Sequence, residues 1–195
     1  MKKTIIAIGA VLSPVIAFFL VDFLLNAYRN QVLPKNFSVV KNGVLYRSGQ
    51  LSSDHFAKLV ALNGIKTVIS LDTANDKRES AMATQLGIYF ESFEMPGTGL
   101  GDPEEFHRFL EIVAEPSSRP VLVHCAAGAK RTGAAVALYR MVFDGWSLED
   151  AVKEMKYSGF DGSPELIEHV AKAYNAIPDD LFRRLTRSET PATIR

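Results

Sequence analysis

Two kinds of hydrophobic pattern divide the chain. From Thr4 to Val21 all positions are uncharged and most are apolar, whereas from about residue 39 short apolar runs alternate with stretches in which apolar residues recur every three or four positions. The short runs predict strands at residues 44–46, 66–71, 88–93 and 121–123. The periodic stretches predict helices at residues 53–63, 77–86, 103–114, 131–143, 148–157 and 165–175. This alternation predicts an α/β domain with a central, mostly parallel sheet flanked by helices.

The N-terminal apolar run is long enough to cross a bilayer core of about 30 Å as a helix. Lys2 and Lys3 precede it, so the positive-inside bias places its N-terminus in the cytoplasm. We therefore expect residues 1–27 to form a signal anchor or transmembrane helix. The alternative is a cleaved signal peptide, although the best cleavage site, after Ala27, has the bulky Leu25 at its −3 position.

Pro34 and several Asn residues follow this segment without sustained periodicity, which predicts a linker over residues 28–38. We expect the folded domain to span residues 39–178. Residues 179–195 are expected to hold the end of the C-terminal helix and a mobile tail. The chain has 22 basic and 22 acidic residues, so it lacks the positive charge typical of nucleic-acid-binding domains and no nucleic acid partner is expected. Its single cysteine, Cys125, excludes an intrachain disulfide and a Cys-rich zinc site.

The apolar strand at 121–123 leads into a stretch with the chemistry of an anion site. His124 and Cys125 end the strand, five residues follow (Ala126, Ala127, Gly128, Ala129 and Lys130), and Arg131-Thr132-Gly133 opens a helix. Loop amides and a helix N-terminus together can bind a phosphate, and Gly128 permits the tight curl. Arg131 adds a planar fork for two phosphate oxygens. The same positive environment favours the thiolate of Cys125, which is the nucleophilic form. Thr132 can donate its hydroxyl to the sulfur, and His124 can position the loop.

The pattern His124-Cys125-x5-Arg131-Thr132-Gly133 resembles the active-site loop of cysteine-based tyrosine and dual-specificity protein phosphatases. The resemblance continues in the segment from Leu45 to Gln50 and in residues 137–155, and it covers residues 39–175 in all. Together with the expected anchor at residues 1–27, the chain most resembles the exported or membrane-anchored bacterial subgroup. The resemblance implies a protein-tyrosine-phosphatase-like fold and a two-step reaction without metal or cofactor. In that reaction Cys125 attacks phosphorus to form a cysteinyl-phosphate, and Arg131 holds the equatorial oxygens.

The family also uses an Asp on an earlier loop to protonate the leaving oxygen. Asp102 is the only acid in the loop from Met95 to Asp102, yet it lies closer to Cys125 than the family usually places this residue. It also begins a helix with the sequence Asp-Pro-Glu-Glu, so capping competes with catalysis. We expect Asp102 to be the general acid. The alternatives are Asp72, Glu104, Glu105, or no side-chain acid.

The expected substrate is phosphotyrosine in proteins, with phosphoserine and phosphothreonine also open. Lys130 is the only basic loop residue besides Arg131, which disfavours a polyanionic inositol phosphate or phosphoinositide. Two other classes stay open, a membrane-tethered phospho-ligand binding module and a rhodanese-like sulfurtransferase. We expect a bacterial inner-membrane protein with its catalytic domain in the periplasm or extracytoplasmic space, or, if cleaved, an exported soluble protein.

Overall fold

The computed structural model describes residues 16–21 and 33–187. The chain divides into two units, residues 1–34 and residues 35–195. Residues 16–21 are helical, and the rest of the expected anchor at 1–27 lies outside the described residues. Among the residues that are described, no helix has the length and apolar character needed to cross a membrane.

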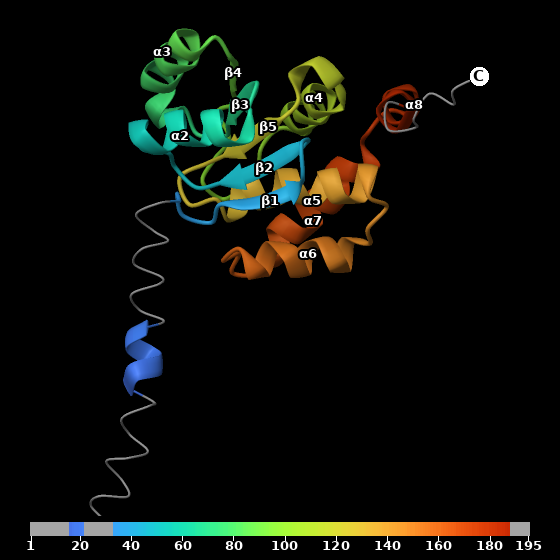
Figure 1. The fold of residues 1–195 in the computed structure, drawn as a ribbon. Helices are drawn as coiled ribbons and strands as arrows, with labels where there is room; N and C mark the ends of the chain where they lie inside the picture. Colours follow the sequence, from blue (N-terminus) through green and yellow to red (C-terminus); the bar gives the residue numbers. More distant parts are fainter. Residues whose placement is uncertain (1–15, 22–32, 188–195) are drawn as a thin grey trace, which may run out of the picture. The chain divides into compact units, whose positions relative to one another are not determined.

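The larger unit is built on a five-stranded mixed sheet with the strand order β1-β2-β5-β3-β4 (Figure 1). Strand β1 pairs antiparallel with β2, and every other neighbouring pair is parallel. The predicted mostly parallel sheet is therefore confirmed, with β1 as a strand that the sequence pattern did not predict. The strands are β1 Ser38–Lys41, β2 Leu45–Ser48, β3 Thr67–Ser70, β4 Tyr89–Ser92 and β5 Val121–His124.

All six predicted helices are confirmed, and their ends follow local chemistry. The hydroxyl of Ser52 caps one helix by accepting from the amide of His55, and the same helix ends at Gly64 in a left-handed conformation. Gly87 ends the next helix in the same way. The helices are α2 Ser53–Asn63, α3 Asp76–Leu86, α4 Pro103–Ala114, α5 Lys130–Phe143, α6 Leu148–Tyr157, α7 Pro164–Asn175 and α8 Asp179–Arg187.

Helices cover both faces of the sheet, and α2 and α3 lie on the face opposite α5, α6 and α7 (Figure 1). Successive strand residues point to opposite faces, so Val121 and Val123 join the core formed with α4 to α8. Leu122 is equally buried but lies outside that core, as do Phe56 of α2 and Ala83 of α3. Helix α5 is buried along most of its length and forms the centre of the larger core.

The structure extends the folded domain beyond the expected limits of 39 and 178. At the N-terminal end, the carbonyl of Lys35 accepts from the amide of Gly49, and β1 begins at Ser38 inside the expected linker. At the C-terminal end, residues 179–187 form α8, whose Leu181 and Leu185 are buried in the core. The remainder of the expected tail, residues 188–195, lies outside the described part of the chain.

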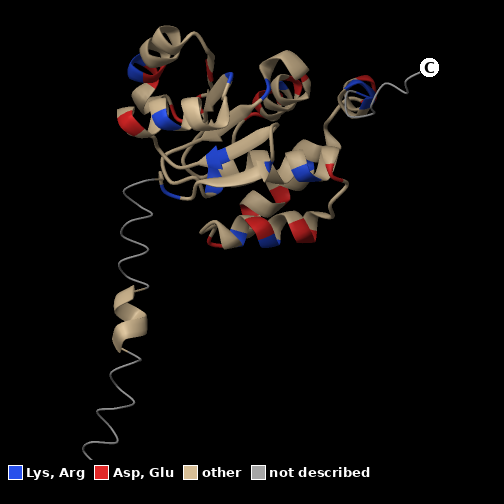
Figure 2. Cartoon of the chain, in the orientation of Figure 1, with Lys and Arg blue, Asp and Glu red and all other residues tan. Residues whose placement is uncertain are grey.

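The parallel strands end in register at one edge of the sheet. Ser48 and Ser70 both pair with His124, and Ser70 also pairs with Ser92. Ligand sites in such sheets form beyond the carboxyl ends of the strands. Basic and acidic residues are interspersed over the surrounding helices (Figure 2), so the charge at this edge depends on the individual side chains that lie there.

Candidate active site

The loop between β5 and α5, residues 125–129, is called the phosphate loop below and carries the proposed nucleophile. Cys125 is 2% exposed, and the amide of Gly128 donates to its sulfur over 3.3 Å. Gly128 has a φ of +69°, and a Cβ there would lie 2.7 Å from the carbonyl oxygen of Ser48. The tight curl around the sulfur therefore requires glycine at this position.

Three consecutive carbonyls of this loop are bonded on the side away from the sulfur. The carbonyl of Ala126 accepts from the amide of Gln50 over 3.1 Å. Those of Ala127 and Gly128 accept from Asn36 Nδ2 over 2.8 Å and from Arg47 Nη2 over 2.7 Å. In a trans peptide the N–H points opposite to the carbonyl, so the amides of residues 127–129 face the sulfur side.

Helix α5 adds its N-terminus to this site. It begins at Lys130, and no side chain caps it at Ala129. The first amides of a helix have no intrahelical partner, and together with the helix dipole they attract an anion. The Gly128 amide on the sulfur and the uncapped start of α5 thus belong to the same short loop as Cys125, and such an arrangement suits an anion.

Arg131 lies in the first turn of α5 and is held beside the loop. Its Nη2 donates to Asp72 Oδ2 over 2.7 Å, and its Nη1 donates to the carbonyls of Leu71 and Met95 over 3.1 and 3.3 Å. The side chains of Arg131 and Asp72 are only 12% and 16% exposed. A phosphate would therefore have to replace one or more of these contacts to gain both guanidinium nitrogens.

Asp72 has two roles in the structure. Its Oδ1 accepts from the amide of Ala74 in a short turn after β3, as expected for an Asx turn. Its Oδ2 binds Arg131. Asp72 follows the carboxyl end of a parallel strand, so its carboxylate lies near the phosphate loop. There it contacts Arg131.

Asp102 caps α4, as its sequence context suggests. Its side chain accepts from the amide of Glu104 over 2.9 Å, and the carboxylate of Glu105 accepts from the amide of Asp102 over 3.1 Å. The preceding loop lies next to the phosphate loop, since a Cβ at Gly99 would lie 3.4 Å from the carbonyl carbon of Lys130. The capping role is therefore observed, and the general-acid role of Asp102 stays a prediction, as do those of Glu104 and Glu105.

A buried contact between His124 and Glu79 behind the nucleophile was not predicted from the sequence. His124 and Glu79 are both fully buried, and His124 Nε2 lies 3.0 Å from Glu79 Oε2. Glu79 Oε1 also accepts from Gln50 Nε2 and from Arg78 Nη2. The backbone carbonyl of His124 accepts from the amide of Leu71 over 2.8 Å. The positioning role expected for His124 stays a prediction, and the structure places its ring against Glu79.

Thr132 and Arg47 are two buried side chains near this loop. Thr132 Oγ1 is buried without a hydrogen-bond partner among the described residues, so its predicted bond to the sulfur is absent and Gly128 supplies that bond instead. Arg47 of β2 is 1% exposed and lies beneath the loop, where its Nη2 donates to the carbonyl of Gly128. The loop carbonyl of Gly128 explains why this arginine points inward.

Lys130 stands at the open side of the site and is paired with the loop before α7. Its Nζ lies 2.7 Å from Asp161 Oδ2, and the two side chains are 36% and 55% exposed. The hydrogen bond from Lys130, with a smaller contribution from the amide of Ser163, lowers the pKa of Asp161. Asp161 therefore stays ionised at neutral pH and offsets the charge of Lys130.

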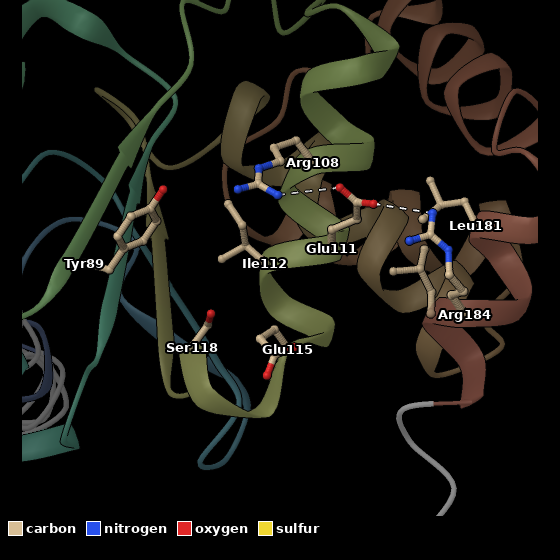
Figure 3. Close-up of a pocket in the computed structure, with 9 residues that line it drawn as sticks. Tyr89, Arg108, Glu111, Ile112, Glu115, Ser118, Leu181 and Arg184 are labelled. Carbon is tan, nitrogen blue, oxygen red and sulfur yellow. Dashed lines mark ion pairs between the residues drawn. The ribbon is translucent and has the colours of Figure 1, made fainter.

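A groove elsewhere on the domain lies away from this chemistry. Tyr89 and Ile112 line it beside Arg184 of α8 (Figure 3), and its volume is about 560 Å³. Tyr89 pairs with Thr67 at the amino ends of β4 and β3, opposite the edge that carries Cys125. Glu111 lies 3.7 Å from both Arg108 and Arg184, so these groove charges compensate one another. Within residues 16–21 and 33–187, no three His, Cys, Asp or Glu side chains are grouped to hold a metal ion.

Comparisons with known proteins identify the family of this chain. A family described as DSP-PTPase phosphatase fused to NAD+ kinase matches residues 25–171. The dual specificity protein phosphatase TpbA of Pseudomonas aeruginosa is 30% identical over 145 residues, which are 74% of this chain and 65% of TpbA. Inositol diphosphatase DSP2 of Oryza sativa is 28% identical over 145 residues, 72% of this chain and 70% of DSP2.

Solved structures share the fold. The core catalytic domain of the PP-IP phosphatase SIW14 from Saccharomyces cerevisiae has a TM-score of 0.67 at 24% identity, covering 78% of this chain and 92% of that one. TpbA in complex with pTyr has a TM-score of 0.59 at 28% identity, covering 77% and 90%. With the family match over residues 25–171, these findings show that the chain belongs to the dual-specificity, protein-tyrosine-phosphatase-like family, whose members are cysteine-dependent phosphoric monoester hydrolases.

Proposed function

We propose that this chain hydrolyses phosphotyrosine in proteins through a cysteinyl-phosphate intermediate. The observation that carries the proposal is the Gly128 amide on the Cys125 sulfur together with the uncapped start of α5 in the same short loop. Such fixed donors stabilise the charge on the transferring phosphoryl group without reorganising during the reaction.

In the first step, the Cys125 thiolate forms a bond to phosphorus as the bond to the tyrosyl oxygen breaks. The leaving oxygen takes a proton from a general acid, for which Asp102 is our proposal and Asp72 the alternative. Arg131 exchanges its contacts with Asp72 and the two carbonyls for the equatorial phosphoryl oxygens. Water then attacks phosphorus, the sulfur leaves as a thiolate, and inorganic phosphate is released.

The charge at the open side of the site, where Lys130 and Asp161 lie, favours phosphotyrosine over polyanionic inositol phosphates. The carboxylate of Asp161 offsets the one loop lysine, Lys130, so a second or third phosphate would meet little free positive charge. TpbA has been solved with pTyr, which supports the same choice. The relatives named inositol diphosphatases keep the second candidate, hydrolysis of a diphosphorylated inositol, open to direct assay.

The test compares three substrates with the full chain: a phosphotyrosyl peptide, the matched phosphoseryl peptide, and a 5-diphosphoinositol phosphate. We expect the phosphotyrosyl peptide to have the highest kcat/KM, inhibition by vanadate, and no activity in Cys125→Ser. Trapping a phosphorylated Cys125 in an acid-quenched reaction would support the covalent intermediate. Faster hydrolysis of the diphosphoinositol would instead assign the site to the second candidate.

We further propose that residues 1–27 anchor the chain in the bacterial inner membrane with the domain outside the cytoplasm. The sequence supports this through the uncharged run from Thr4 to Val21 and the preceding Lys2 and Lys3. Membrane fractionation followed by protease treatment of spheroplasts tests the proposal. A chain that stays in the soluble cytosolic fraction would contradict it.

A further inference from the structure

The phosphate loop is held from behind by three residues that lie between positions 36 and 50 of the chain. We call Asn36, Arg47 and the backbone of Gln50 the loop support, because they bind the carbonyls of Ala127, Gly128 and Ala126 respectively. A carbonyl that turned toward the sulfur would place negative charge where the phosphate must bind. The direction of these three carbonyls is therefore a requirement of the anion site.

Arg47 is an unusual member of this support because its charge is buried. It is 1% exposed, only its Nη2 is hydrogen-bonded in the described structure, and Nε and Nη1 are buried without partners. Burial lowers the pKa of the Arg47 guanidinium, whereas the negative charges of Glu154 and Cys125 act in the opposite direction. A buried cation is costly unless its surroundings compensate it, and the contact that the described structure shows for Arg47 is the one with the loop carbonyl of Gly128.

Asn36 ties the loop to a second element. Its Nδ2 donates to the carbonyl of Ala127 and also to that of Ser158 at the C-terminal end of α6, over 2.8 and 3.0 Å. Its φ of +55° is a left-handed conformation that Asn and Gly adopt more readily than other residues. The side chain is thus held at a fixed position between the loop and α6.

We propose that Arg47 and Asn36 are positioning residues for the phosphate loop. They keep its carbonyls directed away from the anion, because their side-chain donors bind the carbonyls of Ala127 and Gly128. This inference rests on the proposed phosphatase function, yet its consequence for oxyanion binding is measurable without any turnover.

The experiment measures three quantities on the full chain and its variants. The rate of Cys125 alkylation by iodoacetamide is followed against pH, and it reports this residue alone because the chain has one cysteine. Protection of Cys125 by tungstate reports oxyanion binding. The kcat and KM for p-nitrophenyl phosphate report catalysis, and thermal unfolding shows which variants are folded.

For Arg47→Met we expect weaker tungstate protection and a kcat lower by at least about tenfold, because the Gly128 carbonyl loses its buried donor and the loop amides lose their fixed direction. Arg47→Lys keeps the charge but loses the planar guanidinium, so its tungstate protection should stay weaker than that of the wild type. Arg108→Met, which removes an exposed arginine of α4, leaves all three quantities unchanged.

Asn36→Gly keeps the left-handed backbone and removes only the amide. We expect kcat to fall at least about tenfold with a smaller change in KM, because a misdirected loop destabilises the transition state more than the bound substrate. This variant decides the matter if Arg47→Met does not fold. A folded Arg47→Met or Asn36→Gly with wild-type tungstate protection would overturn the proposal. Weaker tungstate protection in variants of a chain that never turns over substrate would instead overturn the phosphatase and leave the positioning role intact.

Discussion

The two sides of the phosphate loop differ in what binds them. On the inner side, three backbone carbonyls accept hydrogen bonds from the loop support, of which Arg47 is 1% exposed. On the substrate side, the cations Arg131 and Lys130 are held by Asp72 and Asp161, and both carboxylates are open to solvent to some degree. The inner contacts can remain fixed throughout the reaction, whereas the outer contacts can be exchanged for phosphate.

The inner contacts therefore position the loop, whereas the outer contacts are available for exchange when substrate binds. A fixed backbone provides donors that cost no reorganisation when charge develops on the phosphoryl group. An arginine held by a carboxylate remains beside the site without a substrate and releases that partner when one binds. Substitutions on the two sides should therefore have different signatures, and the following predictions are ordered from the largest effect to the smallest.

Arg131→Lys should lower kcat/KM for p-nitrophenyl phosphate by about 10³, because the lysine keeps the charge and loses the two-nitrogen fork. Asp72→Asn, which loosens the arginine without removing it, should change kcat/KM by much less. Steady-state kinetics of the two variants, with tungstate binding as a second readout, check this. An equal loss in both would mean that Asp72 has a direct catalytic role.

Glu79→Ala should lower the free energy of unfolding by about 3 kcal/mol, since it leaves His124 and Gln50 without their buried partner. Glu79→Gln, which keeps the hydrogen bond from Gln50, should lose less. Urea denaturation measures both. The exposed Glu149, which pairs with Lys153 on α6, offers the control, and Glu149→Ala should leave stability within about 0.5 kcal/mol of wild type.

The sequence predicted the elements and the loop because both depend on neighbours close along the chain. Hydrophobic periodicity marked every helix except α8, in which Leu181 and Leu185 are flanked by charged residues. The Cys125 loop could be predicted because its glycine, its arginine and the start of the helix all lie within a few positions of Cys125. Local order of this kind needs no knowledge of the tertiary fold.

The support of the loop was not predictable in this way. Asn36 binds carbonyls 91 and 122 positions away, and Glu79 is fully buried in a helix whose sequence is mostly polar. Only the packing of β2, β5 and α3 brings these residues to the nucleophile. A polar residue in a linker or on a polar helix carries no local sign that a distant backbone carbonyl or imidazole will be its partner.

Asp102→Asn tests whether the cap of α4 is also the general acid. If it is, kcat for phenyl phosphate should fall by about 10², whereas p-nitrophenyl phosphate, whose leaving group needs less protonation, should lose much less. Asn remains a good N-cap, so α4 itself should be preserved. The substrate pair is compared across Asp102→Asn and Asp72→Asn, and the variant with the larger difference identifies the acid. Equal small losses in both would leave the reaction without a side-chain acid.

Asp161→Asn should have the smallest effect, and we expect it for one class of substrate and not for the other. Freeing Lys130 should lower KM for a diphosphorylated inositol about threefold at low salt, as expected for an exposed ion pair. KM for p-nitrophenyl phosphate should change little, since its single phosphate already occupies the loop. The gain should disappear as ionic strength rises, because the pair is exposed and screened.

The pH dependence of this effect follows from the lowered pKa of Asp161. The hydrogen bond from Lys130 moves that pKa below its ordinary value of 3.8, so the carboxylate is charged across any assay from pH 5 to 8. The stabilising contribution of the pair is present above the unfolded pKa and is lost as the pH falls through the lower folded one. The difference between Asp161→Asn and wild type should therefore be constant over the neutral range. A difference that vanished between pH 5 and 8 would mean that another group, and not Asp161, controls Lys130.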